Sequence, residues 1–172
     1  MSKKVKRTVI VLLLIMITCL MVMYEVYISY NKITVSDYNI KSNKINNSVN
    51  IVTISDLHDN QLGENNKDLI NEINSLSPDI ILFVGDGVNS DSKDSKVVTS
   101  LMKQLCKNNK VFYSLGNTDI DYIKSYTSDL VRELENMGVT VLNNEYKDIN
   151  INGSSSKLSI KKCGLNLLDL EL

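Results

Sequence analysis

The chain has 172 residues, 43% of them hydrophobic, which is enough for one domain of ordinary size with a buried core. Its formal net charge of −1 provides no broad positive field, so nucleic-acid binding through phosphate neutralisation is not expected. Three cysteines, one of them inside an apolar N-terminal segment, predict neither a disulfide scaffold nor a CxxC metal site. Isolated buried thiols are the expected state of these cysteines.

The N-terminus carries a basic cluster that runs into an uncharged apolar segment. Four Lys and Arg residues lie within residues 3–7, and residues 8–24 are mostly Val, Leu, Ile and Met. This pattern predicts a cytoplasmic basic segment over residues 1–7 and a single-pass transmembrane anchor over residues 8–28. The positive-inside rule then places the remaining chain on the extracytoplasmic side of the cell membrane. A cleaved signal peptide and a buried core helix are the alternatives, but no A-x-A-like triplet follows Tyr24.

The folded domain is expected over residues 33–172, beginning with alternating apolar and polar residues at 33–40 that predict a half-buried strand. A short apolar run at residues 50–55 predicts the next strand. Residues 66–76 place their apolar side chains at helical spacing and predict a helix. Pro78 separates this helix from residues 79–84, whose continuous apolar run is typical of a strand covered on both faces.

The same alternation continues toward the C-terminus. A second helix is indicated by the spacing of Val97, Val98, Leu101, Met102 and Leu105. Residues 110–115 predict a strand, residues 123–137 a third helix that ends at Gly138, and residues 139–142 a further strand. This order predicts an α/β fold in which crossover helices connect a mostly parallel sheet. Two weak strand candidates flank Gly153, and a Leu-rich run at 165–172 has the pattern of no finished element.

Three polar clusters follow three successive predicted strands, and the carboxyl ends of parallel strands meet at one edge of a sheet. The first cluster holds Asp56 and His58, the second Asp86, and the third Asn117. Carboxylate, imidazole and amide groups are suitable ligands for divalent cations, and one carboxylate can bridge two of them. Taken alone, Asp86 is more typical of a helix cap or a turn, Asn117 of a turn, and His58 of a surface or hydrogen-bonded histidine. Their order along the chain favours a two-metal site for a phosphate ester.

These motifs resemble those of the calcineurin-like metallophosphoesterases, especially the membrane-anchored bacterial members. Residues 56–58 (DLH) match the family's D-x-H block, and residues 85–89 (GDGVN) match G-D-x-x-D/N. The resemblance covers about residues 51–142. It implies an αββα sandwich of two sheets flanked by helices, a metal-dependent phosphoester hydrolase, and a pair of divalent ions, either Mn, Fe or Zn. It also implies that Asp56 and His58 bind one metal, that Asp86 bridges, and that Asn117 binds the second.

The third block departs from the family's G-N-H-D/E pattern. Residues 116–119 read GNTD, so Thr118 stands at the position of the family's catalytic histidine, next to Asp119. A hydroxyl cannot replace an imidazolium as general acid, and losing that group costs roughly 10²–10⁴-fold in rate. The resemblance therefore predicts a catalytic block at Thr118 and Asp119 with impaired chemistry.

His58 is the one histidine in the chain, so the family's later histidine ligands have no counterpart. We therefore expect only the first half of the metal site, a truncated phosphoesterase domain, and a parallel sheet with one face and one edge uncovered. The alternative is a catalytically silent, membrane-anchored module that binds a metal or a partner. A nucleotide-binding domain has less support, because neither G-x-G-x-x-G nor G-x-x-x-x-G-K-[ST] occurs. The substrate and oligomeric state are not encoded in these patterns.

Overall fold

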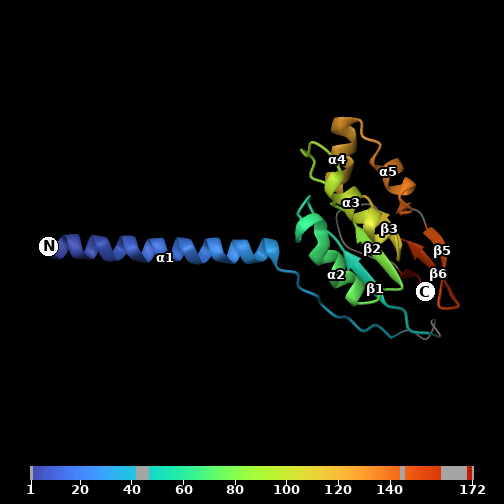
Figure 1. Cartoon of the computed structure of the whole chain (residues 1–172), viewed down its shortest axis with the longest axis horizontal. Coiled ribbons are helices and arrows are strands. Elements are labelled where there is room, and N and C mark those ends of the chain that lie inside the picture. Colours follow the sequence, from blue (N-terminus) through green and yellow to red (C-terminus); the bar gives the residue numbers. More distant parts are fainter. Residues whose placement is uncertain (1, 42–46, 144–145, 160–169, 172) are drawn as a thin grey trace. The chain divides into compact units, whose positions relative to one another are not determined.

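The structure is a computed structural model of the chain, and it describes residues 2–41, 47–143, 146–159 and 170–171. The chain divides into two compact units, Met1–Ser36 and Asp37–Leu172. The first unit contains one helix, α1 (Lys3–Asn31) (Figure 1). Its first turn is capped by the Ser2 hydroxyl, which accepts from the Val5 N–H. None of its residues is buried, and it is long and apolar enough to cross a membrane.

The second unit is built on a parallel four-stranded sheet, as the alternating sequence pattern predicts. Its strands lie in the order β1 (Ile51–Ile54), β2 (Ile80–Val84), β3 (Lys110–Ser114) and β4 (Thr140–Leu142), and each neighbouring pair is parallel. The connecting helices are α2 (Lys67–Ser75), preceded by the 3₁₀ turn η1 (Glu64–Asn66), α3 (Lys96–Leu105), α4 (Asn117–Tyr126) and α5 (Leu130–Asn136). The carboxyl ends of β1, β2 and β3 therefore lie along one edge.

The predicted strand at residues 33–40 is wrong. Residues 32–41 form no regular element, and the side chains of Tyr38 and Ile40 are 86% and 81% exposed. Alternating polarity is compatible with a strand, but a strand also needs a neighbour that accepts and donates its backbone hydrogen bonds. No described strand pairs with this segment.

The predicted third helix is two helices. Helix α4 ends at Tyr126, Thr127 adopts a left-handed conformation with φ +49°, and α5 begins at Leu130. The apolar spacing continues through this break, which is why periodicity alone does not reveal it. The predicted end at Gly138 is confirmed. Its N–H donates to Glu135 O and the next N–H to Leu134 O, the Schellman pattern that a left-handed glycine permits.

A second sheet contains β5 (Tyr146–Ile151), β6 (Ser154–Ser159) and β7 (Leu170–Glu171), in that order and antiparallel. The two strands predicted around Gly153 are therefore confirmed. Asn152 and Gly153 both have positive φ, the conformation of a two-residue hairpin turn. Of the Leu-rich run at 165–172, only residues 170–171 lie within the described part of the chain.

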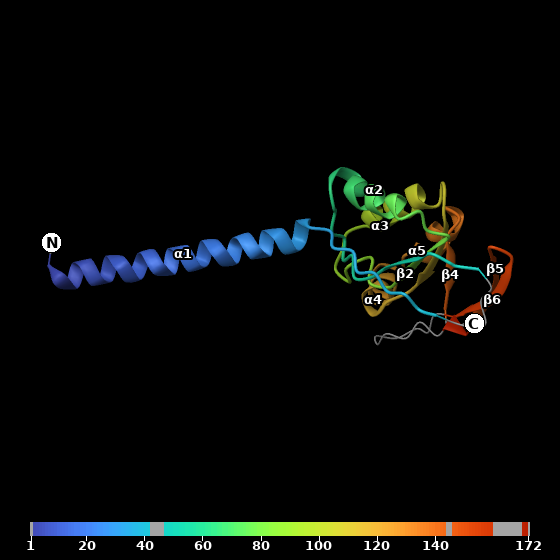
Figure 2. The ribbon, with the colours of Figure 1, turned by 90° about the horizontal axis from the view of Figure 1, so that it is seen from below.

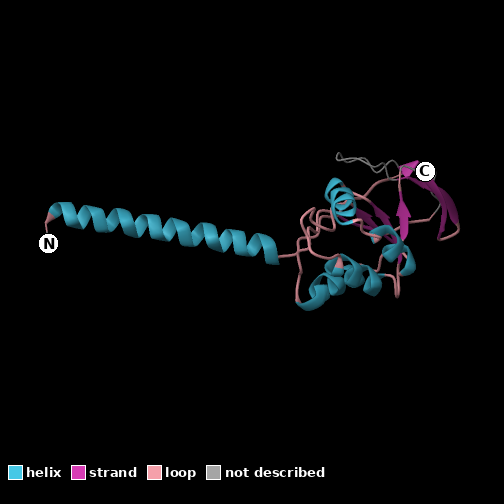
Figure 3. Ribbon diagram, turned by 90° about the horizontal axis from the view of Figure 1, so that it is seen from above, coloured by secondary structure: helices cyan, strands magenta, loops and turns pink. Residues whose placement is uncertain are grey.

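The parallel sheet is covered on both faces, so the expected uncovered face is wrong. On one face Ile80, Leu82 and Phe112 pack with Ile149 and Leu158 of the second sheet. Figures 2 and 3 show α2 and α3 on the opposite side of the parallel sheet from β5 and β6. The second sheet thus covers one face of the parallel sheet whose strands β1 and β2 lead into the loops with the candidate ligands. Both edges of the parallel sheet are open among the described strands, since β1 pairs with β2 alone and β4 with β3 alone.

Candidate metal centre

The loops that follow β1 and β2 are joined by backbone hydrogen bonds beyond the ends of the strands. Asp56 N–H donates to Gly85 O at 3.2 Å, His58 N–H to Asp86 O at 2.9 Å, and Asp59 N–H to Gly87 O at 3.0 Å. These bonds hold the D-x-H segment directly beside the G-D segment. The two predicted metal-binding blocks are therefore positioned by the backbone and not by their side chains alone.

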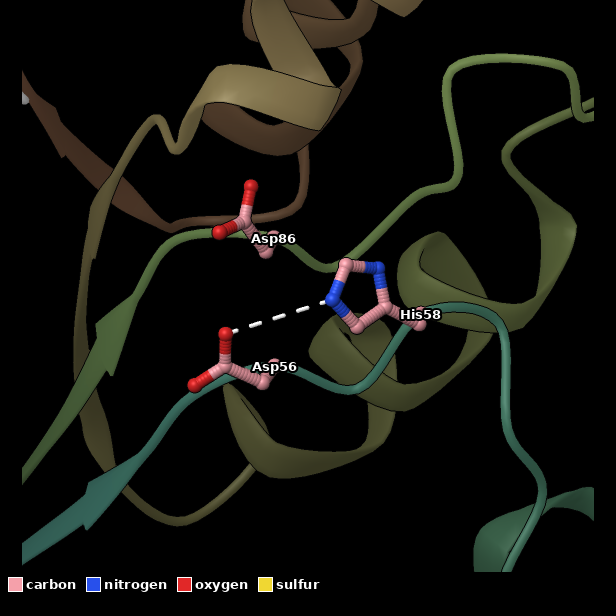
Figure 4. A group of neighbouring side chains, drawn as sticks. All are labelled: Asp56, His58 and Asp86. Atoms are coloured by element: carbon pink, nitrogen blue, oxygen red, sulfur yellow. Dashed lines mark ion pairs between the residues drawn. The ribbon is translucent and has the colours of Figure 1, made fainter. Parts of the chain in front are cut away.

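Three of the four predicted metal ligands gather at this edge. One potential ligand atom from each of Asp56, His58 and Asp86 lies within 4.8 Å of the other two, and Asp56 Oδ1 is 3.9 Å from His58 Nε2. Figure 4 shows the three side chains entering a common space from the two loops. Ligand atoms about 2.1 Å from one cation lie roughly 3–4 Å apart, so a small side-chain movement would suffice. We call these three residues the ligand trio.

The backbone of the ligand trio is in an unusual conformation. Asp56, His58 and Asp86 have φ values of +55°, +48° and +57°, and Asp59 follows at +56°. Only a few per cent of non-glycine residues occupy this left-handed region, although Asp and His are among the more tolerant types. Such strain concentrates at functional sites, where the surrounding structure holds it in place. Motif spacing alone does not reveal this conformation.

His58 is oriented by Asn89, the last residue of the GDGVN block. Asn89 Nδ2 donates to the His58 carbonyl oxygen at 3.0 Å, so Asn89 Oδ1 is the acceptor that faces His58 Nδ1 at 3.1 Å. The Nδ1 atom of a neutral His58 therefore carries the proton, and the lone pair of Nε2 faces Asp56. A metal-binding histidine is commonly fixed in this way by a hydrogen bond at its other ring nitrogen.

Asp119 lies beneath the ligand trio and is fully buried. Its Oδ2 atom accepts from Asp86 N–H and Gly116 N–H, each at 3.0 Å, and from the Tyr113 hydroxyl at 3.1 Å. Its Oδ1 atom accepts from the N–H groups of Gly87 and Val88 at 3.0 and 2.9 Å.

These five donors come from β3 and from the loops after β2 and β3. As the third residue of α4, Asp119 also caps its own helix through the Gly116 N–H. One buried carboxylate therefore ties the second and third motif blocks together.

Burial from water raises the pKa of Asp119 above its ordinary value, and hydrogen bonds from Val88 and Gly116 N–H and from the Tyr113 hydroxyl oppose this increase. Burial also raises the pKa of Tyr113 well above its ordinary value, and the adjacent Asp119 carboxylate adds to that increase. Tyr113 thus remains a neutral hydrogen-bond donor, stacked on Phe83 with the ring centroids 4.7 Å apart. Asp119, Tyr113 and Phe83 therefore form a buried group that holds the loops of the ligand trio in place.

Two glycines allow the second and third loops to touch. A Cβ atom on Gly85 would lie 2.7 Å from Gly116 Cα, and a Cβ atom on Gly116 would lie 2.3 Å from Asp86 Oδ1. Gly85 also has φ +75°. The glycine that precedes Asp86 is thus required both by its conformation and by the close approach of the two backbones.

The remaining predicted site residues lie around this contact. Thr118 reaches Asp86 directly, with its N–H and its hydroxyl 2.9 and 2.8 Å from Asp86 Oδ1. Asn117 is exposed at the first position of α4, and within the described part of the chain its side chain forms no hydrogen bond. Asp119 is turned away into the protein. The structure thus separates the predicted catalytic pair, with Thr118 beside the ligand trio and Asp119 below it.

Asp59 is a polar residue near the site that the sequence patterns did not single out. Its Oδ2 atom accepts from Asn89 N–H at 2.9 Å and from the Ser92 hydroxyl, which fastens the first loop to the second. Its Oδ1 atom is buried and has no hydrogen-bond partner among the described residues. The one feature of the sequence that could have indicated a role for Asp59 is its position directly after the D-x-H block.

Comparison with known proteins agrees with this geometry. A sequence model of the calcineurin-like phosphoesterase family matches residues 49–166, which is more than half of the chain and includes the ligand trio, Asn117, Thr118 and Asp119. The chain is also 30% identical over 152 residues to an uncharacterized metallophosphoesterase of Campylobacter jejuni. That match covers 84% of this chain and 41% of the relative. The chain therefore spans about two fifths of the length of the curated relative that it matches.

Proposed function

The chain belongs to the calcineurin-like phosphoesterases, and on that premise we propose that Asp56, His58 and Asp86 bind a divalent cation used in phosphoester hydrolysis. The observation that carries the proposal is the ligand trio, two carboxylates and an imidazole whose ligand atoms lie within 4.8 Å. Oxygen and nitrogen donors in this mixture suit Mn²⁺, Fe²⁺ or Zn²⁺. A second cation would require further donors, of which Asn117 is the candidate in this chain.

The protein's own contribution is to orient these donors before a cation arrives. Asn89 fixes the tautomer of His58, and the backbone pairing of the two loops fixes the separation of Asp56 from Asp86. When bound, a divalent cation supplies Lewis-acid stabilisation of phosphoryl oxygens and lowers the pKa of water. The substrate class that fits is a phosphomonoester or a phosphodiester.

The chain offers a weak set of groups for the proton transfers of hydrolysis. Thr118 occupies the position of the family's catalytic histidine, and its hydroxyl is engaged by Asp86. Both oxygens of Asp119 are also engaged, by five donors. We therefore propose that this chain alone turns over slowly, roughly 10²–10⁴-fold below a site with a general acid.

We also propose that α1 anchors the domain. Residues 8–28 would span the membrane, residues 1–7 would stay in the cytoplasm, and the domain at 33–172 would lie outside. The supporting observations are an apolar helix without a buried residue and four basic residues at its N-terminal end. Labelling of Ser2→Cys and Ser36→Cys in intact cells, each in a variant whose Cys19, Cys106 and Cys163 are replaced by serine, tests this orientation. Only the cysteine at position 36 should react with an impermeant maleimide.

The alternative is a silent anchored module that binds a cation without hydrolysis. It is favoured by the single histidine of the chain and by the threonine in the third block. Both hypotheses predict saturable Mn²⁺ binding that depends on Asp86. They differ only in turnover.

The deciding experiment measures hydrolysis of nitrophenyl phosphate mono- and diesters by the full chain in detergent. Removal of metal with EDTA should abolish turnover, and addition of Mn²⁺ should restore it. Asp86→Asn should show no turnover with or without Mn²⁺. Asp121→Asn is the matched control, because Asp121 is an exposed carboxylate of α4 whose one ion pair among the described residues is with Lys124. Mn²⁺ binding without turnover would favour the silent module, and the absence of both would refute the metal centre.

A further inference from the structure

Thr118 donates two hydrogen bonds to the same carboxylate oxygen of Asp86. Its backbone N–H lies 2.9 Å and its hydroxyl oxygen 2.8 Å from Asp86 Oδ1. Both residues are half-buried, so water competes only in part for this oxygen. No hydrogen bond within the described residues reaches Asp86 Oδ2. An ionised carboxylate oxygen accepts about two hydrogen bonds, so Oδ1 is saturated while Oδ2 is open.

The backbone of Asp86 is held as firmly as its side chain. Its N–H donates to Asp119 Oδ2 at 3.0 Å, and its carbonyl oxygen accepts from His58 N–H at 2.9 Å. The left-handed φ of +57° is thereby fixed on both sides of the residue. With the backbone fixed, the remaining freedom of Asp86 is rotation of its side chain. The two hydrogen bonds from Thr118 restrict that rotation.

We propose that Thr118 is a positioning residue whose hydroxyl orients Asp86 so that its open oxygen is offered to the cation shared with Asp56 and His58. The inference rests on the proposed function, because it requires a cation at the ligand trio. It gives Thr118 a role in metal affinity that is separate from proton transfer. The threonine in the third block is then a working part of the metal centre.

The size of the effect follows from the kind of contact that is removed. Losing an outer hydrogen-bond partner of a metal ligand typically costs about 10–100-fold in metal affinity. Thr118→Val keeps the shape of the side chain and the backbone N–H donor, and removes only the hydroxyl. We therefore expect about 10-fold weaker Mn²⁺ binding, at the lower end of that range. Thr118→Ser retains the hydroxyl and should bind within about twofold of the wild-type chain.

The test is calorimetric titration of Mn²⁺ into the full chain in detergent, with thermal unfolding recorded in parallel. Thr99→Val is the matched control, because the Thr99 hydroxyl in α3 also donates a hydrogen bond, at 2.9 Å to the Ser95 carbonyl oxygen, and Thr99 is more deeply buried than Thr118. It makes no contact with the ligand trio. Thr99→Val should lower the unfolding temperature without changing the dissociation constant for Mn²⁺. Thr118→Val should weaken Mn²⁺ binding, and Thr118→Ser should restore it.

Three results would overturn the inference. Unchanged Mn²⁺ affinity in Thr118→Val, with binding weakened in Asp86→Asn, would leave the proposed metal centre intact and remove the role of the hydroxyl. Tighter binding in Thr118→Val would show that the hydroxyl competes with the cation for Asp86. If the wild-type chain bound no Mn²⁺ at all, the proposed function and this inference would both fall. The three patterns are distinguishable from one another.

Discussion

Two carboxylates at the same edge of the sheet have opposite environments. Asp119 is fully buried, and its two oxygens accept five hydrogen bonds from three segments of the chain. Asp86 is half-exposed, and its side chain accepts two hydrogen bonds at one oxygen while the other oxygen has none from the described residues. The first carboxylate is satisfied by the protein. The second has bonding capacity left for a ligand.

This difference shows how roles can be assigned to the carboxylates of two motif blocks from their surroundings and not from the motif letters alone. A saturated, buried carboxylate stabilises the loops, since each of its donors would be left unpaired without it. A carboxylate with an open oxygen, beside another carboxylate and an imidazole, gains a partner only when a cation binds. Substitutions at the two positions should therefore separate stability from metal affinity.

The largest effect is expected for Asp119→Asn. The amide nitrogen would replace one of two oxygens that each face at least two donors, so at least two donors would lose their acceptor. At about 1–3 kcal/mol for each buried unpaired donor, the unfolding free energy should fall by about 4 kcal/mol. Urea unfolding of the full chain in detergent measures this change. Asp121→Asn, on the same helix but exposed, should shift it by less than about 0.5 kcal/mol.

Asp86→Asn should produce the reverse profile. The amide oxygen can still accept from Thr118, whereas the amide nitrogen would present hydrogens toward the cation. We expect the dissociation constant for Mn²⁺ to rise on the order of 100-fold, about 2.7 kcal/mol, with the unfolding free energy changed by less than about 1 kcal/mol. Calorimetry and urea unfolding of the same preparation provide the two values. A variant that lost stability but retained Mn²⁺ would contradict the division of roles.

The sequence predicts those features of the fold and the site that depend on the local pattern of apolar and polar residues. Apolar runs buried on both faces identify β2 and β3, and parallel strands bring the residues after them to one edge. That reasoning is enough to bring Asp56, His58 and Asp86 together. It fails at residues 33–40, where alternating polarity has no neighbouring strand, and at Thr127, where the helical period continues through a turn.

The role of Asp119 depends on contacts that no local pattern contains. In the sequence it is the fourth residue of the third block, beside Thr118, and was therefore predicted to act in catalysis. At the third position of a helix its side chain points back to the helix start. It meets there the N–H groups of residues 86–88, which are more than thirty positions away in the chain. Long-range contacts of this kind become visible only in the folded structure.

A smaller effect is expected at Asn89, which orients His58 from outside the ligand trio. Asn89→Leu removes the acceptor of His58 Nδ1 and should weaken Mn²⁺ binding by about 10-fold, the lower end of the range for an outer partner. Asn89→Asp retains an acceptor for Nδ1 and should bind more tightly than Asn89→Leu. Calorimetric titration of both variants makes the comparison. Equal affinities for Leu and Asp would show that the Nδ1 contact does not matter.

The smallest effect is expected at Cys106, the residue that follows α3. Its thiol is partly buried, so the rate of its chemical modification measures how tightly the domain is packed around it. Burial raises the pKa of its thiol above the ordinary value, so at pH 8 the reactive thiolate fraction is smaller than in an exposed cysteine. Iodoacetamide should therefore modify Cys106 several-fold more slowly than a cysteine in a flexible peptide, with the rate still rising as pH passes the ordinary value. Peptide mass spectrometry separates Cys106 from Cys19 and Cys163.

Iodoacetamide modification of Cys106 in the Asp119→Asn and Asp86→Asn variants tests the proposed difference between the two carboxylates. Asp119→Asn loosens the loops packed on the core and should accelerate modification of Cys106, because opening lowers the thiol pKa toward its ordinary value. Asp86→Asn leaves those donors paired and should react at the wild-type rate. If Cys106 were modified equally fast in both variants, and faster than in the wild-type chain, Asp86 would stabilise the packing of the domain as Asp119 does. The open oxygen of Asp86 would then no longer distinguish a ligand from a structural group.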